Sequence, residues 1–179
     1  MVYPNKREYK MSKTQKMIFI SLLVSQAIVL SFIEKMIPLN FSIPGAKLGL
    51  ANIITLTSLY LFSFKETFAI ILLRTIMAAF IGGSVSGFLY SISGAILSFL
   101  IMYLLMRMSL EKISTIGISV VGAVFHNLGQ LLMAAFIIQN LRLVIYLPML
   151  MLTGVVTGMV VGITVKFLLG FLRKIKYFN

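Results

Sequence analysis

Polar and ionisable side chains stand inside the most apolar stretches of the sequence, where they are able to contact a ligand. Between Thr67 and Met106 the one charged residue is Arg74. A lone guanidinium at the centre of a membrane costs about 3 kcal/mol or more unless a partner satisfies it. Further along the chain, His126 and Gln130 are one helical turn apart on the same face. The sequence thus places hydrogen-bonding chemistry at membrane depth.

These polar groups allow two interpretations. They either hydrogen-bond one another and fix the helices, or they line a ligand cavity or its gate. Ionisable groups inside a membrane point to function by default, so we favour the second interpretation for Arg74 and for the cluster at 126–130. The candidate ligand-binding residues are Asn52, Arg74, His126, Asn127 and Gln130.

A short apolar connection is a second candidate feature. Pro38 and Pro44 bracket an irregular segment, because proline lacks a backbone donor and restricts the residue before it. Phe41 makes this segment too apolar for an ordinary exposed loop. We predict that it folds over the outer mouth of the helices as a lid, with packing on lipid headgroups as the alternative. The lid candidates are Pro38, Phe41, Pro44 and Lys47.

Small residues recur at four-residue spacing in several apolar stretches, which lets two helix backbones approach closely in lipid. Packing inside the monomer is the favoured interpretation, for example for Gly154 and Gly158. The stripe in the first apolar stretch is the best candidate for docking a partner subunit. It consists of two pairs, Ser21 with Ser25 and Ala27 with Ser31.

The side chains that catalysis requires are missing. The sequence has no aspartate and four dispersed glutamates, so it offers no acidic cluster to hold magnesium against a diphosphate. One histidine and no cysteine exclude an ordinary zinc site. No phosphate-binding loop ends in Lys-Ser or Lys-Thr, so ATP hydrolysis must come from another protein. We predict neither catalysis nor a metal nor a cofactor.

Apolar helices must position these residues. The chain of 179 residues is 60% hydrophobic and 11% charged, with a mean hydropathy of +1.05, whereas a soluble domain carries about 25% charged residues. At about 20 apolar residues per crossing, this length allows about six spans and no appended domain. We predict an all-α integral membrane protein, a compact bundle with spans at 17–37, 48–62, 67–81, 85–106, 116–139 and 146–172.

The basic residues that give the net charge of +12 gather before the first span and after the last. Basic residues beside spans mark cytoplasmic ends and contact anionic lipid. No basic face or aromatic platform accompanies them, so we do not expect nucleic-acid binding. With six spans both termini share one side, which we predict to be the cytoplasm. The domains are then basic tails at 1–16 and 173–179 around one transmembrane domain at 17–172.

Several segments together resemble one bacterial membrane family, the Gx transporter family, also called heptaprenyl diphosphate synthase component I. The resemblance extends over 19–162, almost the whole membrane domain. Its most specific parts are the runs PGAKLGLAN at 44–52 and HNLGQ at 126–130. Weaker parts are Leu73-Arg74, Ser93-Gly94-Ala95, Tyr146-Leu147-Pro148 and the pair Gly154 and Gly158.

The two family names imply different functions. The transporter name reflects similarity to the S components of energy-coupling factor (ECF) transporters, six-helix membrane proteins that capture a vitamin-like ligand from outside. Those proteins work with a transmembrane coupling subunit and two cytoplasmic ATPases. The synthase name implies a non-catalytic membrane subunit that anchors a polyprenyl diphosphate synthase or a redox assembly. Each name predicts a different set of partners.

We favour the transporter interpretation, because six spans, an apolar lid segment and the lack of an ATP motif all suit an S component. The resemblance then implies a multi-pass protein of the bacterial cell membrane that binds a small vitamin-like, isoprenoid-related or flavin-related solute. One departure is the docking stripe, where S components usually have an alanine pair and this chain has Ser21 with Ser25 and Ala27 with Ser31. The anchoring subunit remains the alternative.

Overall fold

A computed structural model of the chain describes residues 11–36, 49–82, 84–108, 113–172 and 174. Within these residues the fold is entirely helical, with six α-helices, one 3-10 helix and no strand. The elements are α1 (Lys13–Met36), α2 (Asn52–Leu61), α3 (Phe64–Gly82), α4 (Val85–Met108), α5 (Thr115–Ile138), η1 (Leu141–Tyr146) and α6 (Leu147–Leu172).

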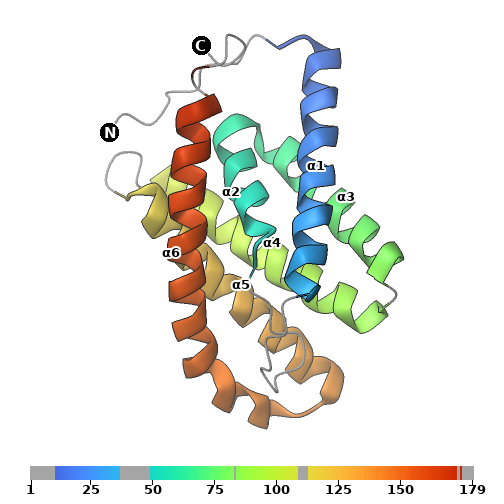
Figure 1. The fold of residues 1–179 in the computed structure, drawn as a ribbon. Helices are drawn as coiled ribbons and strands as arrows, with labels where there is room; N and C mark the ends of the chain where they lie inside the picture. Colours follow the sequence, from blue (N-terminus) through green and yellow to red (C-terminus); the bar gives the residue numbers. More distant parts are fainter. Residues whose placement is uncertain (1–10, 37–48, 83, 109–112, 173, 175–179) are drawn as a thin grey trace.

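Consecutive α-helices run in alternating directions through one bundle (Figure 1). The start of α1 and the end of α6 therefore lie at the same end of the molecule. The short helix α2 occupies the middle and packs against all five other α-helices. Seven of its ten residues are buried, so α2 serves as the centre of the core.

Several helices are long and apolar enough to cross a membrane, which makes the chain a multi-pass membrane protein. Among the described residues four stretches meet this condition, and they are Lys13–Glu34, Val85–Met108, Thr115–Ile138 and Leu141–Leu172. The other two helices differ in physical character. α3 has 19 residues but carries Lys65, Glu66 and Arg74. α2 has 10 residues, or about 15 Å of a hydrocarbon core that is about 30 Å thick.

The observed helices fall where the apolar stretches predicted them, and the main difference is at the start of the chain. α1 begins at Lys13, inside the stretch that was expected to be a tail. The cause is a reciprocal cap, in which the Ser12 backbone N–H donates to Gln15 Oε1 at 2.9 Å and the Gln15 N–H donates to Ser12 Oγ at 3.2 Å. Such a capping box satisfies helix-terminal donors and extends the helix by about a turn.

Glycines draw α6 onto α5. A Cβ atom added at Gly158 would lie 2.6 Å from the Val120 Cα atom, and one at Gly162 would lie 2.7 Å from the Ile116 Cα atom. Real Cβ atoms do not approach backbone so closely, so these positions require glycine. The small residues of α6 therefore serve packing inside the monomer, as we favoured from the sequence.

Candidate functional site

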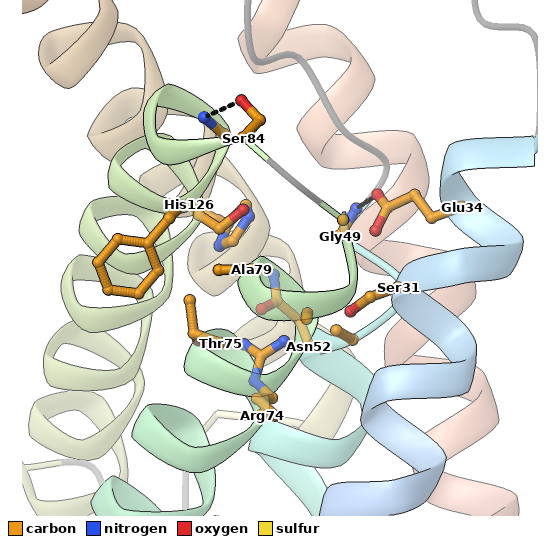
Figure 2. A pocket seen from close by; sticks show the side chains of 15 residues that line it. Ser31, Glu34, Gly49, Asn52, Arg74, Thr75, Ala79, Ser84 and His126 are labelled. Atoms are coloured by element: carbon orange, nitrogen blue, oxygen red, sulfur yellow. Dashed lines mark hydrogen bonds between the residues drawn. The ribbon is translucent and has the colours of Figure 1, made fainter.

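A cavity of about 230 Å³ lies inside the bundle beside the N-terminal end of α2 (Figure 2). The last turns of α1 and α3 line it together with the first turns of α4 and the middle of α5. It lies toward the end of the bundle opposite the start of α1. Its polar lining includes Ser31, Glu34, Asn52, Arg74, Thr75 and His126.

The neighbouring helices continue beyond the first turn of the short helix α2, and the described residues leave a cavity there. The chain enters α2 through Gly49, whose φ of 75° is strained for any residue with a side chain. A Cβ atom there would also lie 2.9 Å from Asn52 Nδ2. Gly49 therefore keeps this wall of the cavity clear.

Glu34 joins the end of α1 to the entry of α2. Its carboxylate accepts a hydrogen bond from the backbone N–H of Gly49, and its side chain is buried. Figure 2 shows Glu34 reaching from α1 toward Gly49. A buried carboxylate is costly unless donors and an opposite charge satisfy it. Gly49 provides one such donor.

Arg74 supplies the opposite charge from the middle of α3. Its side chain is 6% exposed, and its guanidinium donates through Nη2 to Thr55 Oγ1 at 3.2 Å. Glu34 is a described residue of opposite charge that lines the same cavity. Within the described part of the chain, Arg74 Nε has no hydrogen-bond partner. Arg74 is thus held in the core by its hydrogen bond to α2.

Asn52 places an amide against the cavity from the first turn of α2. The residue is 4% exposed, and neither Nδ2 nor Oδ1 has a hydrogen-bond partner among the described residues. His126 lines the same cavity from α5, and its ring lies near Gly49 and Gly94. Three of the five predicted ligand-binding residues, Asn52, Arg74 and His126, therefore meet at one cavity.

The other two predicted ligand-binding residues, Asn127 and Gln130, are not among the described residues that line the cavity. Asn127 Nδ2 donates to the Leu150 backbone oxygen at 2.8 Å and so ties α5 to α6. Gln130 packs against α4, where a Cβ atom at Gly94 would lie 2.8 Å from Gln130 Cγ. The sequence placed His126 and Gln130 on one helix face, but α4 covers the Gln130 end of that face.

The two pairs of the predicted docking stripe lie differently on α1. Ser21 and Ser25 are exposed, and the Ser25 hydroxyl donates to the Ser21 backbone oxygen at 2.8 Å. Ala27 is fully buried, and Ser31 lines the cavity. The exposed part of the stripe is therefore the Ser21 and Ser25 pair. The four lid candidates, Pro38, Phe41, Pro44 and Lys47, lie outside the described residues.

Sequence reasoning did not include Glu34 among the site residues, because a charge at the end of an apolar span is typical of the membrane boundary. A signal was present, since Ser31 and Glu34 are three residues apart and hence share a helix face with Ala27. The described residues contain no group of three side chains suited to hold a metal ion. The cavity therefore offers hydrogen bonds and two opposite charges as its chemistry.

Comparison with known proteins adds one family assignment. Residues 23–168 match the family described as heptaprenyl diphosphate synthase component I. This stretch includes every polar cavity residue named above. No curated protein and no solved structure matches the chain.

Proposed function

Because the chain belongs to the heptaprenyl diphosphate synthase component I family, we propose that it is a non-catalytic membrane subunit that binds a small solute in the cavity beside α2. More specifically, we propose that the chain is the substrate-binding component of an ECF-type transporter. In that role the chain captures solute, and a separate coupling subunit with two ATPases supplies the energy for transport. The resemblance to S components and the cavity support this role.

The observation that carries the proposal is the set of unsatisfied polar atoms around the cavity. A buried polar group without a partner costs about 1–3 kcal/mol. Asn52 and Arg74 line the cavity and carry buried atoms that have no hydrogen-bond partner among the described residues. A bound solute that supplies the missing partners recovers this free energy as affinity.

Six crossings follow if α2 and α3 are counted with the four long helices. The charges Lys65 and Glu66 stand at the first turn of α3, where they are able to reach the headgroups, while Arg74 donates a hydrogen bond to Thr55 inside the bundle. α2 needs no lipid contact along its length, because the other helices surround it. The prediction of both termini in the cytoplasm then places the cavity in the outer half of the membrane.

This placement suits capture from outside, but binding alone performs no uphill work. A solute shifts the protein only toward the conformation to which it binds more tightly, so accumulation requires coupling to another energy source. The exposed Ser21 and Ser25 on α1 are the docking surface that we propose for the coupling subunit. Small side chains there allow a partner helix to approach closely.

The family description favours a second role, since it names one component of a heptaprenyl diphosphate synthase. In that role the chain anchors a prenyl synthase at the membrane. Affinity purification of the tagged protein from its native membranes, with mass spectrometry of the retained proteins, separates the two. A membrane coupling protein with two ATPases would support transport. A prenyl synthase without ATPases would contradict transport and support anchoring.

A further inference from the structure

The described lining of the cavity carries one charge of each sign. Among the described residues that line it, Glu34 contributes one negative charge and Arg74 one positive charge. All the other described lining residues are uncharged when His126 is neutral. A charge brought into a low-dielectric interior without a counter-charge costs several kcal/mol. The walls therefore favour a solute whose own net charge is zero.

Buried atoms of the lining residues that have no hydrogen-bond partner among the described residues indicate which groups a solute would offer them. Arg74 Nε and Asn52 Nδ2 are donors, and Asn52 Oδ1 is an acceptor. Both residues are more than nine-tenths buried, and both line the cavity. A carbonyl or carboxylate oxygen satisfies the two donors, and a neighbouring N–H group satisfies the acceptor. Carboxamides, lactams and amino acids all present these two groups together.

The size of the cavity restricts the solute further. Its 230 Å³ equals the volume of about eight water molecules at about 30 Å³ each. Pockets for drug-sized ligands begin at about 300 Å³, so the volume favours a solute smaller than those. An isoprenoid diphosphate fits neither the charge nor the size of the cavity. Its headgroup carries several negative charges, and its chain needs additional apolar space.

On the premise of the proposed solute-binding function, we infer that the cavity takes a small net-neutral solute with a carbonyl-type oxygen beside an N–H group, either an amide or an amino-acid-like zwitterion. The oxygen accepts from Arg74 Nε and Asn52 Nδ2, and the N–H donates to Asn52 Oδ1. Glu34 balances the charge of Arg74 and so excludes solutes with an excess negative charge.

The test is equilibrium dialysis of the purified full-length protein in lipid nanodiscs. The probe is the aqueous small-molecule extract of the cells that express it, divided by ion exchange into neutral or zwitterionic, anionic and cationic pools. Mass spectrometry then identifies what the wild type concentrates relative to Asn52→Leu, which keeps the volume but removes both amide atoms. The matched control is Thr57→Val. It also removes a buried polar group from α2 with little change in volume, but Thr57 is not among the described residues that line the cavity.

We expect the wild type and Thr57→Val to concentrate a small compound from the neutral or zwitterionic pool at least tenfold over Asn52→Leu. If Asn52→Leu does not fold, Ala79→Leu is the reference instead, because it fills the cavity from α3. A compound from the anionic or cationic pool would overturn the inferred solute class and leave solute binding intact. Retention of no compound from any pool would overturn solute binding as well, since water would then fill the cavity.

Discussion

Arg74 and Glu34 are buried charges of opposite sign that line the same cavity. Removing one partner of a buried ion pair leaves the other uncompensated and costs about 3–5 kcal/mol, whereas removing both is often nearly neutral. We predict that these two charges are coupled in this way, and the prediction is tested by changing the two residues singly and together.

We expect Arg74→Met to lower the free energy of unfolding by about 3 kcal/mol or more, and Arg74→Met with Glu34→Gln to regain most of it. Thermal unfolding in detergent measures both variants, and their difference gives the coupling between the two residues. Arg107→Met, at the exposed last turn of α4, is the control and should melt like the wild type. A single Arg74→Met variant that unfolds at the wild-type temperature would show that the two charges are not coupled.

An ion pair joins α1 to α3 at the opposite end of the bundle. Lys16 Nζ donates to Glu66 Oε1 at 2.7 Å, and the Ser63 backbone N–H donates to Glu66 Oε2 at 2.9 Å. Partial burial alone would raise the pKa of Glu66, but these hydrogen bonds outweigh it and hold the pKa below its ordinary value of 4.5. A lowered folded pKa means that the ionised carboxylate stabilises the folded state.

This stabilisation is complete above the unfolded pKa of about 4.5 and is lost as the pH falls through the lower folded pKa. We therefore expect the melting temperature to fall between pH 6 and pH 3. The fall should be only a few degrees, because a partly exposed ion pair contributes little to stability. Glu66→Gln should reduce that fall, and Glu66→Gln and the wild type should converge at the acid end. An equally steep fall in both proteins would assign the pH dependence to other groups.

At the scale of elements, the contact between α5 and α6 depends on glycines at the interface. We expect Gly158→Ala to destabilise the bundle by about 1–3 kcal/mol, because the new methyl group overlaps the Val120 backbone. Gly170→Ala in the same helix is the matched control, since a Cβ atom there meets nothing within 4 Å. Alanine also favours helix over glycine, so Gly170→Ala should be neutral or stabilising. Equal melting temperatures for the two variants would contradict the close contact.

Hydropathy located the helices because it is a property of local sequence. The predicted stretch 48–62 contains α2 at Asn52–Leu61, and the stretch 85–106 contains most of α4. The capping box at Ser12 was also visible in the sequence, although a count of charges assigned Ser12 to a tail. Local signals of this kind require no knowledge of neighbouring helices.

The faces of the helices were harder to predict, because they depend on which helices become neighbours. Ala27 and Ser31 have the spacing of a docking stripe, but their side of α1 turns inward. Asn127 stands beside His126 in the sequence, yet it binds α6 instead of facing the cavity. The rotation of each helix about its own axis decides which face turns inward. An apolar helix has no strong amphipathic pattern that predicts this rotation, since lipid and core are both apolar.

At the scale of the whole molecule, the cavity lies where the short helix α2 begins among five longer helices. Half-helices inside membrane bundles commonly border solute sites, because the missing half leaves space and backbone ends near the midplane. Here α2 provides Asn52 at its start and Thr55 one turn later. The Thr55 hydroxyl accepts a hydrogen bond from Arg74. The proposed function therefore depends on this cavity being accessible from outside.

The absence of cysteine from the sequence allows a direct measurement of that accessibility. Single cysteines are introduced into the tagged protein and treated in intact cells with a charged methanethiosulfonate reagent that does not cross membranes. Ala79→Cys probes the cavity wall on α3, Ala134→Cys probes the fully buried core of α5, and Arg107→Cys probes the opposite end of α4. Permeabilised cells give the reference labelling.

We expect Ala79→Cys to react in intact cells, Arg107→Cys to react after permeabilisation alone, and Ala134→Cys to stay unlabelled in both. This result would establish an outward-facing cavity in the membrane-embedded protein. If Ala79→Cys stays unlabelled, or reacts after permeabilisation alone, the cavity is closed or faces the cytoplasm, and capture of a solute from outside is contradicted.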